Sequence, residues 1–355
     1  MRSFQYPGGV YNATPPRVVF GPGSVAGIAD EVTRLGAERA LIISTPGRVR
    51  LAEKVRDLVG DLGIGILDEA ISQVPIELAR RGREKAHDAD CLISVGGGAA
   101  TGLSKGIALD LGMPIINIPT TYSGSEMTGF CGITIDGVKR MHTSLNMLAS
   151  TVVYDAELTT GLPPSVSASS AMNALAHCID ALYLPTLSPL LAAAAVEGAE
   201  VIARALPEVL ADPARLESRN ELLYGAYLGG AALTGGFALQ HGVAHALGGS
   251  FGVEHGLAHA IVLPHVTGYL EQHVDLGPIA EAFKTDHLGG AVHDLLVSSG
   301  LPASLAEVGL TEADLDRATA IILETESDGA VSPVPVTEQA VAGILRDAYT
   351  GRRPV

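Results

Sequence analysis

The chain has 355 residues and a formal net charge of −16, from 23 Lys and Arg against 39 Asp and Glu. This length accommodates about two domains of ~150 residues, and the 47% hydrophobic content excludes a disordered chain. The acidic balance argues against nucleic acid and anionic membranes as partners. An anionic small-molecule substrate would therefore need a local group of positive or hydrogen-bonding side chains.

Cysteine usage and the N-terminal sequence favour a cytoplasmic protein. Cys91, Cys131 and Cys178 are widely spaced and form no C-x-x-C pair or disulfide framework, which is typical of a reducing compartment. Residues 1–12 lack the apolar segment of a signal peptide. No apolar run is long enough to cross a membrane.

Short apolar runs alternate with amphipathic stretches through the first 155 residues. A strand that ends in the Gly21-Pro22-Gly23 turn comes first. The following strands are expected at 40–44, 63–67, 91–95, 114–118 and 151–154, with helices at 24–35, 51–62, 76–86 and 101–111. This alternation predicts a parallel sheet with helices on both faces.

The composition shifts after Leu162-Pro163-Pro164. Long Ala- and Leu-rich stretches predict helices at 192–206, 215–233 and 280–299, and residues 325–337 are expected to form a loop. We therefore predict an α/β dinucleotide-binding domain with a parallel sheet over 1–158. An all-helical substrate and catalytic domain is expected over 159–355.

Two loops in the first half have the composition of a nucleotide site. Gly96-Gly97-Gly98 directly follows an apolar strand and precedes a helical stretch that contains Lys105. Glycines let the backbone approach a phosphate, and a helix N-terminus offers unpaired N–H groups to it. The next strand ends in the hydroxyl-rich segment 119–126, and ligands of open α/β sheets bind at such strand ends. The alternative for the glycines alone is a tight structural turn.

Histidines concentrate in the second half. Five of the eleven fall within residues 241–265, in the sequence HGVAHALGGSFGVEHGLAHAIVLPH. His241 and His245 share one helix face at a spacing of four, as do His255 and His259, and Asn173 and His177 upstream. Such pairs are what a metal site or a polar catalytic pocket requires. For a lone His on an apolar helix, such as His265, a structural role is expected.

These motifs, in order, resemble the iron-containing (group III) alcohol dehydrogenase superfamily. The resemblance rests on GGG-x6-K, PTT-x2-GSE, N-x3-H, H-x3-H and H-G-x2-H-A-x3-P, which span residues 96–264. Within the superfamily the loop GGGAATGLSK, PTTYSGSEMT and NALAHCIDALY are most similar to maleylacetate reductases. The resemblance implies a Rossmann-like N-terminal domain and a helical C-terminal domain, the fold shared with dehydroquinate synthase. It also implies a cytoplasmic homodimer that acts in the breakdown of aromatic compounds.

The resemblance also carries over the metal-ligand positions, with a departure. These positions are Asn173, His177, His241 and His255 in this chain. The first is an Asp in the wider superfamily, and the amide is a weaker ligand than a carboxylate. A further Asp in the glycine loop is replaced by Gly102. Both replacements are shared with maleylacetate reductases, which implies a degenerate site and no bound metal.

The implied cofactor is NADH, with NADPH also accepted. The second strand ends in Ser44-Thr45 rather than in an acidic residue, so the sequence neither attracts the ribose hydroxyls strongly nor repels a 2′-phosphate. By resemblance the cofactor site comprises Gly97, Gly98, Ala99, Thr101, Thr120, Thr121, Ser125, Lys139 and Leu158.

The implied reaction is reduction of the carbon–carbon double bond of maleylacetate, a dicarboxylate, to 3-oxoadipate. Hydride addition places negative charge on the conjugated carbonyl oxygen, so a donor and one proton are needed. His245 is the leading proton donor, since it shares a helix face with His241 but is not at a metal position. We expect His177, His241 and His255 to bind the carboxylates, with Tyr122 and Asn173 as secondary donors.

Three alternatives stay open at this point. The first is a metal-dependent alcohol dehydrogenase of the same superfamily, the second an NAD-using lyase of the dehydroquinate-synthase type, and the third a non-catalytic nucleotide-binding module. Ser332-Pro333-Val334-Pro335 also replaces an Asn-Pro-Arg-Pro stretch of the family. The loss of that arginine leaves a closely related substrate open.

Overall fold

The computed structural model describes residues 11, 15–136, 138–185, 187–327 and 332–355. Two compact units divide between Leu162 and Pro163, close to the expected domain boundary at 158–159. We call them the α/β unit and the helical unit and describe each by itself. The expectations for residues 1–10, 12 and 328–331 concern positions outside the described residues.

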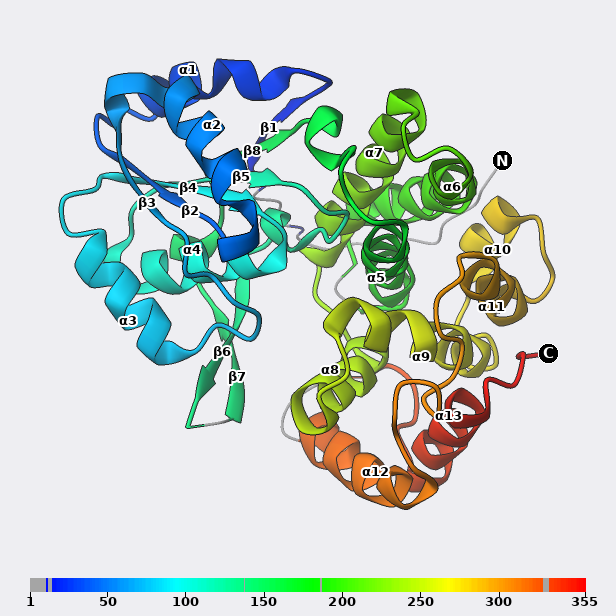
Figure 1. Cartoon of the computed structure of the whole chain (residues 1–355). Coiled ribbons are helices and arrows are strands. Elements are labelled where there is room, and N and C mark those ends of the chain that lie inside the picture. The colour runs from blue at the N-terminus through cyan, green and yellow to red at the C-terminus, as the bar shows by residue number, and fades with distance from the viewer. Residues whose placement is uncertain (1–10, 12–14, 137, 186, 328–331) are drawn as a thin grey trace. The chain divides into compact units, whose positions relative to one another are not determined.

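The α/β unit is built on a six-stranded parallel sheet, which confirms the predicted fold class (Figure 1). The strand order is β1–β8–β5–β4–β2–β3. The bounds are β1 Arg17–Phe20, β2 Ala40–Ile43, β3 Gly63–Leu67, β4 Cys91–Gly96, β5 Ile115–Pro119 and β8 Thr151–Tyr154. Each of these strands lies where the sequence predicts one. The four strands β2, β4, β5 and β8 are buried throughout, so their sequences are nearly continuous apolar segments.

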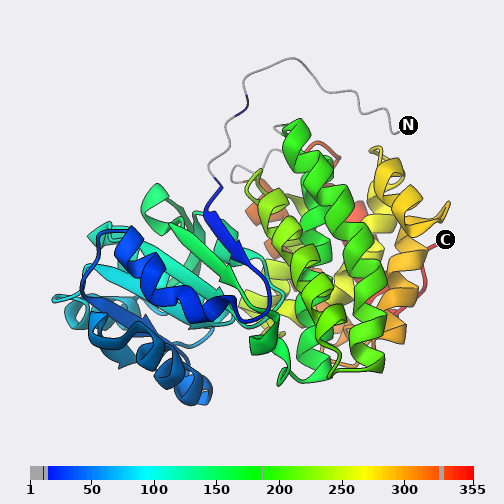
Figure 2. The ribbon, with the colours of Figure 1, turned by 90° about the horizontal axis from the view of Figure 1, so that it is seen from above.

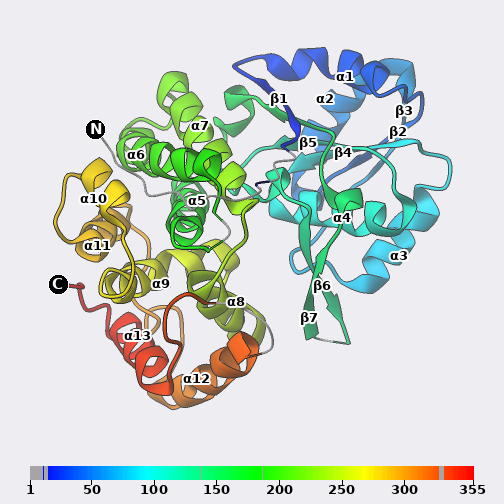
Figure 3. The same cartoon turned by 180° about the vertical axis from the view of Figure 1, so that it is seen from behind.

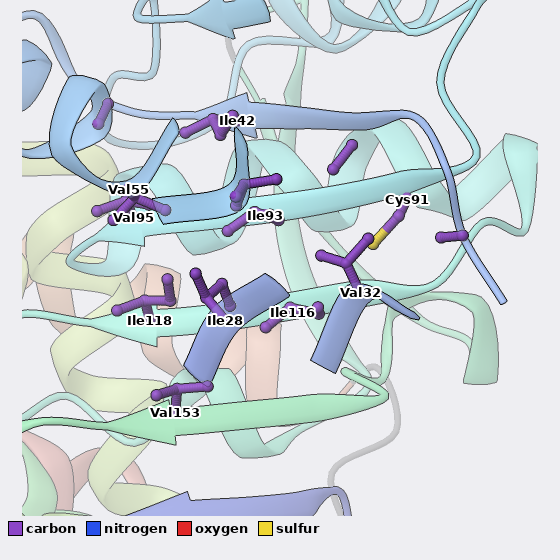
Figure 4. Packing of buried hydrophobic residues seen from close by; sticks show 14 residues of the cluster. Ile28, Val32, Ile42, Val55, Cys91, Ile93, Val95, Ile116, Ile118 and Val153 are labelled. Carbon is purple, nitrogen blue, oxygen red and sulfur yellow. The ribbon is translucent and has the colours of Figure 1, made fainter. Parts of the chain in front are cut away.

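Alternate residues of each strand point to opposite faces of the sheet. Helices cover both of these faces. Ile42, Ile93 and Ile116 belong to a core with α1 (Ile28–Arg34) and α2 (Val49–Val59), shown in Figure 4. Their neighbours Leu41, Leu92 and Ile115 pack with α3 (Ile76–Lys85) and α4 (Gly98–Leu111). Helices therefore cover the sheet on both sides.

An antiparallel hairpin in the same unit is absent from the sequence-based expectation. Its strands are β6 (Phe130–Ile135) and β7 (Val138–Thr143), paired from Phe130↔Thr143 to Ile135↔Val138. Strand β7 is mostly polar and largely exposed, so it lacks the apolar run that marks the parallel strands. The Asp136-Gly137 dipeptide between the strands is a hairpin signal that the apolar pattern does not reveal.

The helical unit contains nine described helices and no strand among its described residues. The bounds are α5 Pro164–Leu182, α6 Pro189–Ala211, α7 Leu216–Leu233, α8 Leu239–Phe251, α9 His255–Leu270, α10 Gly277–Phe283, α11 Leu288–Ser298, α12 Glu312–Ser327 and α13 Glu338–Thr350. Helices α5, α6 and α7 pack together (Figure 2), and α12 packs on α13 (Figure 3). No described helix is both long and apolar enough to span a membrane.

Two expectations for this unit are wrong in detail. A single helix over 280–299 is interrupted, because Lys284 ends α10 in the left-handed conformation (φ 55°). Helix α11 then starts afresh, where the Glu271 carboxylate accepts from the Gly289 N–H at 2.9 Å. The loop expected over 325–337 begins later than predicted, since α12 continues to Ser327.

Candidate active site

The strand order of the α/β unit reverses next to the glycine loop. The chain passes from β2 outward to β3 and then returns to β4 on the other side of β2. Dinucleotides bind outside the carboxyl ends of strands at such a reversal. Here those ends carry Ser44 and Thr45 after β2 and Gly96–Gly98 at β4. The topology therefore places Ser44-Thr45 and Gly96–Gly98 at the same edge of the sheet.

The glycine loop is shaped for close approach by a ligand. A Cβ on Gly98, the first residue of α4, would meet no atom within 4 Å, so the helix N-terminus is open. A Cβ on Gly97 would lie 2.9 Å from Thr121 Cγ2, so only glycine fits beside that loop. The Thr121 hydroxyl is buried without a hydrogen-bond partner among the described residues. An open helix N-terminus beside an unsatisfied hydroxyl fits a cofactor phosphate.

A buried network supports the second cofactor loop from beneath. The Lys105 ammonium on α4 donates to Ser125 O at 2.6 Å, to Thr128 Oγ1 at 3.1 Å and to Phe130 O at 2.8 Å. The fully buried Glu126 accepts from Tyr154 Oη at 2.8 Å. Burial lowers the pKa of Lys105 to about 8 and raises the pKa of Glu126. Lys105 therefore fixes the loop after β5 and does not itself face solvent.

The other predicted cofactor residues lie on elements around these loops. The Thr101 N–H bonds Gly97 O at 3.2 Å, and the Thr120 N–H bonds Gly96 O at 3.0 Å, which ties the two loops together. Lys139 lies on β7 and packs across Gly132. Leu158 packs against the α1–α2 side of the core. The contacts of Lys139 and Leu158 with a cofactor stay predictions, as does the role of Ala99 in the first turn of α4.

Gly102, at the position where the resemblance implies an Asp, has little room for a side chain. A Cβ at Gly102 would lie 2.6 Å from Val74 Cγ2. Val74 is buried and has a positive φ of 38°, which is strained for a β-branched residue. The segment before α3 therefore fills the space where a side chain would otherwise stand.

Five histidines of the helical unit form one contiguous group, the histidine cluster: His177 on α5, His241 and His245 on α8, and His255 and His259 on α9. His259 lies at its centre, with its ring centroid 4.6 Å from that of His241 and 4.7 Å from that of His255. His177 stacks on His241 at 5.2 Å, and His245 on His255 at 5.6 Å. The structure thus brings together all four predicted catalytic histidines and adds His259.

The members of the histidine cluster differ in solvent exposure. His177, His241 and His259 are buried, His245 is half-buried and His255 is exposed. Burial, followed by the neighbouring imidazoles, holds the pKa of His177 and of His259 well below the usual value. These two side chains are therefore neutral near pH 7, and the open side of the cluster is at His255.

Asp180 is the functional residue that the sequence analysis misses most clearly. This fully buried carboxylate accepts from His241 Nδ1 at 2.6 Å, from the Ala238 N–H at 2.9 Å and from the Tyr183 hydroxyl. Burial raises the pKa of Asp180, but the hydrogen bonds led by His241 outweigh it and lower the pKa overall. Asp180 therefore caps the start of α8 and orients His241. Asn173, His177 and Asp180 follow at i, i+4 and i+7, a helix-face spacing that could have revealed it.

Tyr122 and Asn173, the secondary donors, are both buried. Tyr122 belongs to the α/β unit, where its hydroxyl donates to Thr159 Oγ1 at 3.3 Å. Asn173 lies one turn before His177 on α5. Contacts of either side chain with a substrate stay predictions.

His265, outside the histidine cluster, should make stability depend on pH. Burial, aided by His293 with its ring centroid 6.3 Å away, lowers the pKa of His265 to about 4. Unfolded His265 takes up a proton below about pH 6.5 while the folded side chain does not, so stability present above pH 6.5 is lost on acidification. At pH 5 the loss is about 2 kcal/mol.

His265→Gln should remove this part of the pH dependence. The free energy of unfolding of the variant, measured by urea titration at pH 5 and pH 8, should fall less on acidification than that of the parent. Parallel pH profiles for the two proteins would show that folded His265 titrates normally.

Comparisons with known proteins identify the class. Residues 15–156 match the iron-containing alcohol dehydrogenase family, and residues 167–349 match the C-terminal domain of that family. The chain is 41% identical over 350 residues to the maleylacetate reductase of Rhizobium sp. (strain MTP-10005), covering 97% of this chain and 99% of that protein. It is 39% identical to the maleylacetate reductase of Burkholderia cepacia, with the same coverage.

A solved structure supports the same family assignment. The crystal structure of maleylacetate reductase from Agrobacterium tumefaciens superposes with a TM-score of 0.92 at 39% identity and covers 100% of both chains. The chain belongs to the iron-containing alcohol dehydrogenase family and is an oxidoreductase.

One of the four metal-ligand positions that the resemblance implies is occupied by an amide in this chain. Asn173 puts an amide where the superfamily has a carboxylate. His241 Nδ1 bonds Asp180, so Nε2 is the ring nitrogen that faces a ligand. Among the described Cys, His and acidic side chains, the ligand atoms that converge within 4.8 Å of one another belong to His245, His255 and His259. Of these, only His255 is a superfamily ligand position.

The region of the lost arginine lies elsewhere in the helical unit. Val334 is buried, and the Pro335 carbonyl accepts from Tyr269 Oη at 2.5 Å. The apolar Val334 side chain is thus part of the packing near the end of α9.

Proposed function

We propose that this oxidoreductase is a maleylacetate reductase. The observation that carries the proposal is the histidine cluster, in a chain whose relatives at 41% and 39% identity are maleylacetate reductases over nearly their full length. A pocket of imidazoles supplies the N–H donors and the proton that reduction of an anionic enone requires. The proposed substrate is a small dicarboxylate, and the proposed assembly is a cytoplasmic homodimer, as in the family resemblance.

The proposed reaction balances with one hydride and one proton. A reduced nicotinamide bound at the glycine loop would supply the hydride for the double-bond carbon farther from the carbonyl group. The electron pair of the double bond would then shift to the carbonyl oxygen. Hydrogen-bond donors of the histidine cluster stabilise this enolate. A proton from His245 then adds to the carbon next to the carbonyl. The products are 3-oxoadipate and the oxidised cofactor.

We propose that no metal takes part. The support is the donor set itself, in which Asn173 offers an amide where the resemblance implies a carboxylate. In this reading N–H groups of His177, His241 and His255 bind the substrate carboxylates. Neutral N–H donors bind carboxylates through charge-assisted hydrogen bonds, so a cation is not needed for binding.

Activity should therefore survive removal of metal ions. The direct test is oxidation of NADH with maleylacetate before and after dialysis against EDTA, with metal content measured on protein purified without chelator. We expect an unchanged rate and far less than one ion per chain. A rate lost to EDTA and restored by Fe²⁺ or Zn²⁺ would identify a metal-dependent dehydrogenase, and no oxidation with maleylacetate at all would refute the substrate.

Use of both nicotinamide cofactors is the second expected property. The crevice edge after β2 carries Ser44, which is fully buried, and Thr45, and neither discriminates by charge. The ratio of kcat/KM for NADH to that for NADPH should stay below about 1000-fold, or about 4 kcal/mol. Thr45→Asp should lower kcat/KM for NADPH about 10-fold or more while NADH use is retained. A larger parental preference would show that other residues read the 2′ position.

A further inference from the structure

A buried amide fixes the protonation pattern of the central histidine. Gln240 on α8 is fully buried, and its Nε2 donates to the His259 carbonyl oxygen at 3.2 Å. The same Nε2 lies 3.4 Å from His259 Nδ1. A carbonyl oxygen only accepts, so it determines which end of the amide faces α9. The amide nitrogen can only donate, so in this contact Nδ1 is the acceptor.

This contact leaves a hydrogen-bond donor without a partner. A neutral imidazole whose Nδ1 accepts carries its hydrogen on Nε2. His259 Nε2 is buried, and it has no hydrogen-bond partner among the described residues. A buried donor left unpaired costs about 1–3 kcal/mol, so it points to a ligand that binds there.

The surroundings of His259 favour an anionic ligand. The four other imidazoles of the histidine cluster have ring centroids 4.6–6.5 Å from that of His259. The cluster opens to solvent at His255, which gives access from outside. Asp180, beside His241, has its carboxylate hydrogen-bonded by His241, the Tyr183 hydroxyl and the Ala238 N–H.

We propose that His259 is a substrate-binding residue whose Nε2–H donates to a carboxylate of the dicarboxylate substrate, and that Gln240 is the positioning residue that keeps this hydrogen on Nε2. The inference deepens and rests on the proposed function. It also accounts for the disagreement with a metal site, because a protonated Nε2 has no lone pair for a cation. The three converging nitrogen atoms of His245, His255 and His259 then act as an anion site.

Binding of an unreactive dicarboxylate tests the role of His259 without turnover. The probe is adipate, measured by isothermal titration calorimetry on the full chain with NAD⁺ present. His259→Phe should weaken adipate binding about 10- to 100-fold, as expected for loss of a hydrogen bond to a charged group. His259→Gln, which keeps an N–H donor, should recover part of the affinity. His265→Gln on the same helix is the matched control and should bind adipate like the parent.

Gln240→Leu separates positioning from structural support. Without the amide, Nε2 can present a lone pair, so adipate binding should weaken about 3- to 10-fold while Zn²⁺ binding tightens. If Gln240 only supported the structure, Gln240→Leu would lower the melting temperature but would not change the affinities for adipate and Zn²⁺ in opposite directions. Long-range ¹H–¹⁵N spectra of the imidazoles should show hydrogen on Nε2 of His259 in the parent.

The outcomes distinguish this inference from the proposed function. Equal adipate affinity in the parent and in His259→Phe, or hydrogen on Nδ1 of His259, would overturn the role of His259. Stoichiometric Zn²⁺ binding by the parent that His259→Phe abolishes would overturn it in favour of a cation site. No adipate binding by the parent would instead refute the dicarboxylate substrate class.

Discussion

His245→Asn should lower kcat by about 10²- to 10⁴-fold with a much smaller change in KM, because general acids contribute a rate factor of this size. His245 shares the α8 face with His241, with ring centroids 5.7 Å apart. It is half-buried, so its proton can be replaced from solvent after each turnover. The measurement is steady-state oxidation of NADH with saturating maleylacetate.

His241→Asn is the decisive comparison for this assignment. His241 is the rival donor, since Asp180 holds its Nδ1–H and leaves Nε2 for proton transfer. If His241 only binds and orients, its replacement should raise KM more than it lowers kcat. A fall in kcat of less than about 10-fold in His245→Asn would remove His245 as the donor. His273→Asn, at an exposed position just after α9, should leave both constants unchanged.

The parallel sheet is the most predictable part of the molecule, for a physical reason. Strands buried on both faces must be apolar throughout, and Ala40–Ile43 and Cys91–Gly96 show this directly. The hairpin strand β7 is largely exposed and mostly polar, so its sequence carries no comparable signal. The break between α10 and α11 depends on the backbone conformation of Lys284, which an apolar pattern does not encode.

The candidate site likewise has a part that the sequence predicts and a part that depends on tertiary packing. Spacings of four along a helix correctly predict that His241 lies beside His245 and His255 beside His259. The role of Asp180 depends on the first N–H groups of α8, at Ala238 and beyond, which lie far from it in sequence. The function of Gln240 likewise exists only when α8 packs on α9. Local spacing reveals which side chains share a helix, and tertiary packing decides what they bind.

Asp180→Ala should lower the free energy of unfolding by about 3–5 kcal/mol, since it removes one partner of a buried charged hydrogen-bond network. The change leaves the Ala238 N–H, His241 Nδ1 and the Tyr183 hydroxyl without their acceptor in a fully buried place. The chain contains no tryptophan, so unfolding in urea should be followed by far-UV circular dichroism near pH 7.5.

Asp294→Ala is the matched control, because it also removes a carboxylate from an ion pair, but at the surface. Asp294 accepts from Arg353 at 2.8 Å with both side chains largely exposed to water. Solvent screens such pairs, so this variant should differ little from the parent in stability. Asp180→Asn keeps one acceptor oxygen, so its free energy of unfolding should lie between those of Asp180→Ala and Asp294→Ala. Equal losses for Asp180→Ala and Asp294→Ala would contradict the network, because burial is what makes the difference between an orphaned hydrogen-bond donor and one that water can satisfy.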